Sequence, residues 1–344
     1  MPWWEKEKLQ DRMPFLMARN LAKNAIRKWF EVQDFTEVET AQLQTSPGNE
    51  VHLLGLETQW TSPELESQQM FLATSPEFAC KKLIAGGMER IFEFARVFRN
   101  RDLSPIHTPE FTMLEWYRAN QDWNVAIEDT CAICLAAANS IGAKYFRNKE
   151  FQIPINAKPE RLTLQEAFLK FANIDMLSTI SYDGKTKRDE FAKLAINSGI
   201  NIDDNDNWSD IFTKVLVAKI EPDLGKEAPT ILCEYPLPEG ALAQKCSHDN
   251  RVVERFELYI CGIEIANGFG ELIDAEEQKQ RFESAMDEQI KIYGKSYPID
   301  YDLLDAISHM PPTSGVALGF DRLLMLITGA RNINDVLWSP FIRN

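Results

Sequence analysis

The segment from Phe98 to Tyr117 carries charged and aromatic side chains in a pattern suited to ligand binding. Arg99 stands near its start, and a guanidinium group can hold a phosphate through two parallel hydrogen bonds. Glu115 and Tyr117 are two residues apart, so on a β-strand their side chains point to the same face. A carboxylate beside a phenol suits an ammonium ligand. Taken alone, the segment fits a solvated hairpin equally well.

A second group of polar side chains interrupts apolar strands between residues 257 and 271. It consists of Glu257, Glu264, Asn267 and Glu271. Buried carboxylates are unfavourable unless cations or a metal pair with them, and Mg²⁺ prefers oxygen ligands together with phosphates. Solvent-facing acids explain Glu257 easily. They explain the three residues from 264 to 271 poorly, because these stand among glycine and phenylalanine.

A third segment, Ser314–Leu326, brings glycines and an arginine to the start of an apolar helix. Glycine lets the backbone approach a ligand closely, and Arg322 follows two such positions, Gly315 and Gly319. The pattern of a Walker loop and the Rossmann fingerprint are both missing. By itself, this spacing indicates no particular ligand.

The elements that must position these residues are strands joined by long connections. Strands are predicted at 35–40, 53–60, 70–73, 91–98, 111–118, 230–235, 255–261 and 264–269, and helices at 15–30, 75–84, 123–141 and 275–293. Residues 314–326 form a strand, a turn and a helix. Residues 145–230 differ, because three helical patterns alternate there with polar turns. We therefore expect an α+β fold with a mainly antiparallel sheet flanked by helices, and one domain, 1–344, with a mostly helical insertion at 145–230.

The chain has 344 residues, with 52 acidic and 37 basic side chains and a net charge of −15. Nucleic-acid binding gains affinity when Lys and Arg neutralise phosphates, so this balance disfavours a large tRNA-binding surface. Residues 1–28 differ, since they carry a surplus of four positive charges. A basic helix of this kind fits an acidic protein partner, and it fits a solvated helix face at least as well.

No apolar run approaches the roughly 20 residues that span a bilayer, and the charged N-terminus has no apolar signal core. We therefore expect a soluble, cytoplasmic protein with no membrane partner. Of the six cysteines, only Cys131 and Cys134 form a C-x-x-C pair. Because no second pair stands at zinc spacing, we expect packed thiols rather than a metal or redox site.

Together, the three segments resemble the catalytic motifs of class II aminoacyl-tRNA synthetases, and most closely those of the lysyl group. The matching stretches are Phe98-Arg-Asn, His107-x-Pro-Glu-Phe-Thr-Met-x-Glu, Glu264-x-x-Asn-Gly-Phe-x-Glu-Leu and Gly319-x-Asp-Arg-Leu. The resemblance extends from about residue 15 to the C-terminus. Residues 31–40 resemble the dimerisation motif of this class, with Ala41 in place of its usual proline, which implies a homodimer.

A lysyl-tRNA synthetase carries an anticodon-binding barrel before the dimerisation motif. Because that motif begins here within the first 40 residues, we expect the barrel to be absent. Ser75-Pro-Glu, the segment from Arg99 to Tyr117 and Ser314-Gly-Val-Ala-Leu-Gly instead resemble the stand-alone ligases that attach (R)-β-lysine to a lysine side chain of elongation factor P. This resemblance implies ATP as a substrate, Mg²⁺ and a protein acceptor in place of tRNA. Two alternatives stay open: a truncated synthetase-like enzyme that activates L-α-lysine, and a non-catalytic paralogue that senses lysine.

The resemblance also implies a role for each matching residue. Arg99 and Arg322 are the expected catalytic residues, which hold the α- and γ-phosphates of ATP. The remaining nucleotide contacts are expected at Asn100, Arg101, His107, Thr108, Phe111, Glu264, Ile265 and Gly319. Glu257 and Glu264 would carry Mg²⁺. The distal ammonium group would lie at Tyr117 and Glu271, and the amino and carboxylate end of the substrate at Ser75, Pro76, Glu77, Glu115 and Asn267.

Three positions depart from the lysyl pattern. Ala317 replaces the glycine usual in lysyl-tRNA synthetases, and its methyl group would reshape the pocket near the reacting end, which fits a β- rather than an α-amino acid. Arg101 stands where the family usually has a glutamate near the adenine, and Asp102 follows it. Thr108 replaces an asparagine common in the ligases. We therefore expect the adenine contacts to differ from the family pattern more than the phosphate contacts do.

Overall fold

A nine-stranded sheet runs through the computed structural model, which describes residues 2–341. Its strands lie in the order β1 (Thr36–Glu37), β5 (Arg90–Phe98), β6 (Glu110–Ala119), β14 (Thr313–Gly319), β13 (Ile263–Gly270), β12 (Asp249–Ile260), β10 (Thr230–Pro236) and β9 (Glu160–Thr163), and β11 (Lys245–Cys246) also pairs with β12. Only the β1–β5 and β9–β10 pairs are parallel. The predicted α+β fold with a mainly antiparallel sheet is therefore confirmed.

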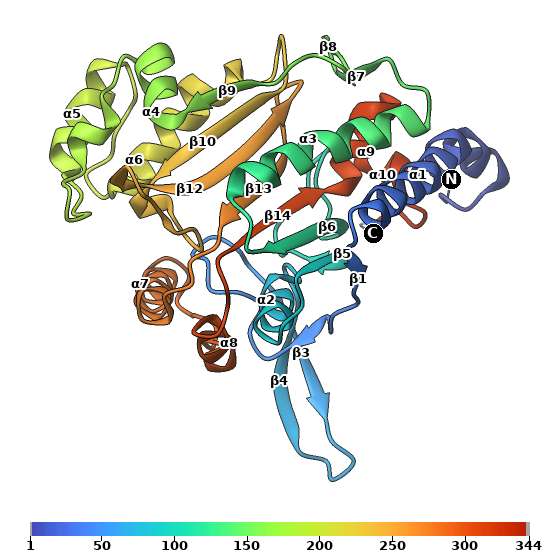
Figure 1. Ribbon diagram of the computed structural model, residues 1–344, viewed down its shortest axis with the longest axis horizontal. Coiled ribbons are helices and arrows are strands. Elements are labelled where there is room, and N and C mark those ends of the chain that lie inside the picture. Colours follow the sequence, from blue (N-terminus) through green and yellow to red (C-terminus); the bar gives the residue numbers. More distant parts are fainter. Residues whose placement is uncertain (1, 342–344) are drawn as a thin grey trace.

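Helices cover the two faces of this sheet (Figure 1). One face packs against α1 (Lys6–Val32), α3 (Trp123–Ser140), α9 (Phe320–Thr328) and α10 (Ile333–Val336). The other packs at one end against α2 (Glu77–Ala85), α7 (Ala275–Tyr293) and α8 (Tyr301–Ile307). Alternation along β6 explains the division, because Leu114 and Trp116 enter the first core whereas Tyr117 enters the second.

Within the region 145–230, buried residues between Leu162 and Leu224 form a second hydrophobic cluster with residues of β10 and β12, whereas Phe146 and Ile153 belong to the first core. The helical segments of this region are α4 (Leu164–Ala167), α5 (Arg188–Asn197) and α6 (Trp208–Val215), with π-helical turns at Phe168–Ala172 and Leu216–Ile220 and short 3₁₀ turns at Met176–Thr179 and Glu221–Asp223. The three predicted helical patterns lie on these segments. The region also contains the hairpin of β7 (Tyr145–Asn148) and β8 (Phe151–Pro154) and the edge strand β9. The bounds of the insertion stay a prediction.

A small sheet projects from the main body (Figure 1). It consists of β2 (Leu43–Gln44), β4 (Ser67–Leu72) and β3 (Leu56–Thr61), and the β3–β4 hairpin forms its outer end. A 3₁₀ turn, Leu237–Glu239, completes the regular elements of the described chain. None of the helices formed by residues 2–341 combines the length and apolar character that a bilayer span requires.

The basic N-terminal region is partly used inside the fold. Arg12 and Arg19 of α1 are buried. Arg19 forms an ion pair with Asp321 and donates to Thr112 Oγ1 at 2.7 Å, and Arg27 pairs with Glu37 at 2.7 Å. These contacts fasten α1 to the sheet, so its positive charge is only partly available to a partner.

Candidate active site

Four adjacent strands place polar residues in one row across the sheet. Glu115 on β6 lies opposite Ala317 on β14, and Ala317 lies opposite Asn267 on β13. Asn267 in turn lies opposite Glu257 on β12. Because directly opposed residues of paired strands share a face, the sheet brings the three sequence segments together on the side away from α1 and α3.

The next row contains Tyr117 on β6, Gly315 on β14 and Phe269 on β13. A Cβ atom on Gly315 would lie 2.3 Å from Glu271 Oε1 and 2.5 Å from Tyr117 Cε1. Only glycine therefore fits here. Glu271 and Tyr117 are therefore held close together, as their expected role in binding the distal ammonium group of the substrate requires.

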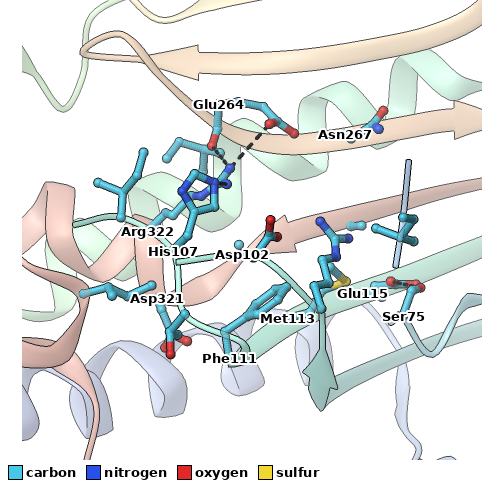
Figure 2. A pocket seen from close by; sticks show the side chains of 18 of the residues that line it. Ser75, Asp102, His107, Phe111, Met113, Glu115, Glu264, Asn267, Asp321 and Arg322 are labelled. Atoms are coloured by element: carbon cyan, nitrogen blue, oxygen red, sulfur yellow. Dashed lines mark hydrogen bonds and ion pairs between the residues drawn. The ribbon is translucent and has the colours of Figure 1, made fainter. Parts of the chain in front are cut away.

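A cleft with about 980 Å³ of space lies over this face of the sheet (Figure 2). Figure 2 shows His107, Glu264 and Arg322 toward one end and Ser75 and Glu115 toward the other. Arg99, whose charge acts on His107 and Glu264, also lines the cleft, as do Thr108, Phe111, Glu77, Asn267 and Ala317. Ile265 and Gly319 also line it. The cleft therefore brings most of the predicted site residues together, whereas Pro76, Asn100, Arg101, Tyr117, Glu257 and Glu271 are not in its wall.

The end with the two arginines is suited to anions. Arg99 has its guanidinium carbon 5.3 Å from the centre of the Phe111 ring, and its Nε is buried without a hydrogen-bond partner among residues 2–341. Its backbone N–H donates to the carbonyl of Pro109 at 2.9 Å, which fixes the start of the loop. Buried polar groups are normally hydrogen-bonded, so this free N–H group is a ready donor to a phosphate oxygen.

Arg322 and His107 form the other half of that end. Arg322 Nη2 lies 2.5 Å from His107 Nε2, and Ser104 Oγ lies 2.7 Å from His107 Nδ1. Because arginine can only donate, Nε2 must be the acceptor, so the proton of the neutral ring sits on Nδ1 and is donated to Ser104. Burial, and then Arg322, lowers the pKa of His107. The neutral imidazole therefore adds no charge and orients Arg322.

Glu264, together with Asp102, supplies an acidic side chain to this end and is a candidate metal ligand. Arg322 Nη1 donates to its carbonyl at 2.9 Å and lies 3.4 Å from its Oε2. Burial, and then Glu257, raises the pKa of Glu264, so a nearby cation would favour its ionised form. Glu257 accepts from Arg255 at 2.7 Å and from Tyr259 at 2.8 Å. Residues 2–341 contain no group of three or more potential ligands. The expected Mg²⁺ site at Glu257 and Glu264 stays a prediction, and the carboxylate of Glu264 fits an ion that phosphate oxygens also coordinate.

The opposite end is suited to amines. Tyr117 donates to Glu115 Oε2 at 2.7 Å, and the Ser75 hydroxyl donates to Glu115 Oε1. Ser75 Oγ also accepts the backbone N–H of Glu77 at 3.0 Å, which ties Ser75 to the first residue of α2. Burial, and then Glu77, raises the pKa of Glu115 to about 8. Asn267 Oδ1 is buried and has no partner within the described chain. These acceptors can receive ammonium hydrogens.

The side chains of Arg101 and Asp102, neighbours in the loop after β5, lie on different sides of that loop: Asp102 lies in the cleft wall and Arg101 does not. Arg101 has a left-handed backbone with a φ of 66°, and its guanidinium carbon lies 5.6 Å from the Tyr293 ring. Asp102 lines the cleft. Asn100 is exposed, and its backbone N–H donates to the carbonyl of Leu54 at 2.7 Å. The structure therefore does not bring Asn100 and Arg101 to the nucleotide end, and their contacts with ATP stay a prediction.

Sequence reasoning missed two buried charged residues. Asp321 accepts the backbone N–H of Thr112 at 2.7 Å and pairs with Arg19, so it ties α9 to β6 and α1. Lys81 lies between Glu77 and Glu271, the carboxylates expected to bind substrate amines. The spacing Glu77-x-x-x-Lys81 on one helix face was a visible signal for this contact.

Comparison with known proteins places the whole described fold in a familiar group. Residues 5–343 match the family described as tRNA synthetases class II (D, K and N). Curated proteins named elongation factor P–(R)-β-lysine ligase from Salmonella arizonae, Salmonella typhi and Salmonella choleraesuis are each 37% identical to the chain over 329 residues. Each match covers 94% of this chain and 94% of the relative.

Proposed function

Because the chain belongs to the family of class II tRNA synthetases (D, K and N), we propose that it activates (R)-β-lysine with ATP and transfers it to a lysine side chain of elongation factor P. The proposal rests on the cleft, which extends over one face of the sheet from an end lined by arginines to an end lined by carboxylates. The 37% identity to ligases of that name supports the choice of substrate and acceptor.

The first step forms an acyl-adenylate. A carboxylate oxygen of the amino acid attacks the α-phosphorus of ATP, the bond from that phosphorus to the bridging oxygen breaks, and pyrophosphate leaves. Arg99 stabilises the charge that develops at the α-phosphate, and Arg322 holds the γ-phosphate. A magnesium ion held by Glu264 and phosphate oxygens would neutralise further charge.

The amine end positions the attacking carboxylate. Glu115, supported by Ser75 and Tyr117, receives one ammonium group, and Asn267 lies across the row from it. Holding both reactants in one cleft lowers the activation free energy, because their translational and rotational freedom is already lost when they bind. In the second step, the neutral lysine amine of elongation factor P attacks the acyl carbon. The bond to the phosphate oxygen breaks, AMP leaves, and the amine proton passes to solvent. No side chain of the chain needs to become a covalent nucleophile.

Exposed apolar residues on α1 support a homodimer. Met13, Met17 and Leu21 follow one another at intervals of four residues and are 36%, 49% and 50% exposed. They therefore form a stripe on the helix that precedes residues 34–40 of the segment resembling the dimerisation motif. Wild-type chain should have the mass of a dimer in size-exclusion chromatography with light scattering, and Met17→Glu should shift it toward a monomer. A monomeric wild type at micromolar concentration would contradict this assembly.

Ala317 is expected to set the preference between β- and α-lysine. It stands between Glu115 and Asn267 in the central row, so its methyl group forms the floor where the amino end must lie. Ala317→Gly should lower exchange with (R)-β-lysine and raise it with L-α-lysine, and the ratio should change at least about 10-fold, the scale of one methylene in a pocket.

The control for this variant is Ala266→Gly. Ala266 lies on β13 but belongs to the core on the opposite face, so this change loosens a neighbouring strand without altering the cleft. Both variants are compared by amino-acid-dependent ATP–pyrophosphate exchange. An unchanged substrate ratio in Ala317→Gly, or an equal change in Ala266→Gly, would remove Ala317 from this role.

The same assay tests the proposed function. Wild-type chain should support exchange with (R)-β-lysine in clear preference to L-α-lysine. A preference for the α isomer would instead favour a synthetase-like enzyme that activates lysine. Absence of exchange with any diamino acid would favour a non-catalytic paralogue.

A further inference from the structure

Three carboxylates and one ammonium group form a buried cluster at the amine end of the cleft. Lys81 is fully buried, and Glu115 and Glu271 are each 1% exposed. Lys81 Nζ lies 2.7 Å from Glu77 Oε1 and 2.6 Å from Glu271 Oε2. The other oxygen of Glu271 faces Gly315 and Tyr117. Lys81 therefore holds that carboxylate from one side and leaves its second side toward Tyr117, where the distal ammonium group of the substrate is expected.

No second cation of the described chain pairs with this cluster. The remaining titratable groups around it are Cys80 and Tyr117, with Glu93 and Glu50 farther out. Burial and then Glu77 raise the pKa of Glu50, whereas Arg99, Arg255 and Lys81 lower it. The neighbouring Lys82 pairs instead with Asp300 and Asp302. If all three carboxylates are ionised, two negative charges are therefore left without a partner. Such charges are unfavourable in a buried site unless cations arrive.

We propose that Lys81 is a positioning residue that neutralises one carboxylate equivalent of this cluster, so that the cleft accepts an amino acid with two ammonium groups. The inference rests on the proposed activation of a diamino acid and deepens it. Two ammonium groups balance the two remaining charges, whereas an amino acid with one ammonium group leaves a buried carboxylate unpaired. Lys81 thus contributes to selecting the charge of the substrate without touching the reacting atoms.

The charge balance has a pH signature. Burial raises the pKa of Glu115 to about 8, with Glu77 as the next cause. A bound ammonium group favours the carboxylate, so KM for the diamino acid should fall as the pH rises toward 8. Burial opposes ionisation of Lys81, but Glu271 and Glu77 raise its pKa above the usual range, so Lys81 stays charged throughout. Without the Lys81 ammonium group, the carboxylates should ionise at a higher pH, so the fall in KM should also occur at a higher pH.

The test replaces the charge without changing the length of the side chain greatly. Lys81→Met should raise KM for (R)-β-lysine at least about 30-fold at pH 7, the lower end for truncating one partner of a buried charge pair. KM for ATP should stay near the wild-type value. Lys81→Arg keeps the positive charge, so it should retain most of the wild-type affinity for the amino acid and leave the pH dependence of KM near that of the wild type.

Lys82→Met is the matched control, because Lys82 follows Lys81 on α2 but pairs outside the cleft. It should leave KM for the amino acid unchanged. An unchanged KM in folded Lys81→Met, or a folded Lys81→Arg as impaired as Lys81→Met, would overturn the inference. If Lys81→Met does not fold, Lys81→Arg decides: a KM near the wild-type value supports charge neutralisation, whereas a folded Lys81→Arg with the full loss, or failure of both variants to fold, assigns Lys81 a packing role.

These measurements separate the inference from the proposed function, because they use whichever amino acid supports exchange. If L-α-lysine is the substrate, the β-lysine assignment fails while the Lys81 effect should persist. If only amino acids with a single ammonium group support exchange, the charge-matching role of Lys81 is wrong.

Discussion

Arg99→Ala is expected to lower ATP–pyrophosphate exchange at least about 10²-fold, the scale of losing one preorganised electrostatic stabiliser. The Arg99 side chain lies against Phe111, and its buried Nε has no other partner within residues 2–341. It is therefore held in place before ATP arrives and need not be withdrawn from another contact. Arg99→Lys should recover little activity, because an ammonium group cannot reproduce the two-point geometry of a guanidinium group.

The matched control is Arg96→Ala. Arg96 lies on β5, three residues before Arg99, and has the same charge, but it is exposed and lies 4.0 Å from Glu110, outside the cleft. Exchange by this variant should stay near the wild-type rate. Near-wild-type exchange in Arg99→Ala would remove Arg99 from catalysis, and equal losses in both variants would indicate a general effect of charge.

Glu115→Gln is expected to weaken binding of the diamino acid and to stabilise the fold at the same time. KM for (R)-β-lysine should rise at least about 30-fold, because the variant removes one charge of a buried pair. KM for ATP should change little. The amide can keep contacts with Ser75 and Tyr117, so a loss in KM would report the missing charge rather than missing hydrogen bonds.

The effect on stability follows from the raised pKa of Glu115. Burial moves the pKa from its ordinary value of 4.5 to about 8 in the folded protein. Between these values the folded state holds a proton that the unfolded state has lost, so stability falls as the pH rises through this window. Glutamine does not titrate. The midpoint of thermal unfolding of Glu115→Gln should therefore exceed that of the wild type at pH 8, and the difference should shrink toward pH 5.

Glu110→Gln on the same strand provides the control. Glu110 is exposed and lies 4.0 Å from Arg96, outside the cleft. It should change neither KM nor the pH dependence of the unfolding midpoint. A wild-type KM in Glu115→Gln would contradict the amine-binding role of Glu115, and a lower midpoint at pH 8 would contradict its buried, proton-holding state.

The convergence of the three polar segments could be predicted from their joint resemblance to the catalytic motifs of class II synthetases, whereas the spacing of Glu115 and Tyr117 alone fits a solvated hairpin equally well. The register could not. Whether Ala317 or a neighbour lies opposite Glu115 depends on pairing between strands about 200 residues apart in the chain, and a slip by one residue would turn the side chain to the other face. The structure supplies that register.

Other features depend on long-range contacts or on local backbone geometry that residue patterns do not show. The use of Arg19 inside the fold depends on Asp321, near the opposite end of the chain. Arg101 has a left-handed backbone, which is uncommon for a residue with a side chain, and its guanidinium group lies over Tyr293 rather than in the cleft wall. The spacing of Lys81 from Glu77 was visible, but its second partner, Glu271, came near only through the packing of α2 on the sheet.

The intact mass of elongation factor P shows whether the chain transfers β-lysine to this protein. The chain is produced together with elongation factor P in cells that lack their own modifying ligase, and (R)-β-lysine is supplied. We expect a mass increase equal to one β-lysyl group on one lysine side chain, and no increase when the chain carries Arg99→Ala. Unmodified elongation factor P beside a wild-type chain that supports exchange with (R)-β-lysine would contradict the proposed transfer of β-lysine to elongation factor P.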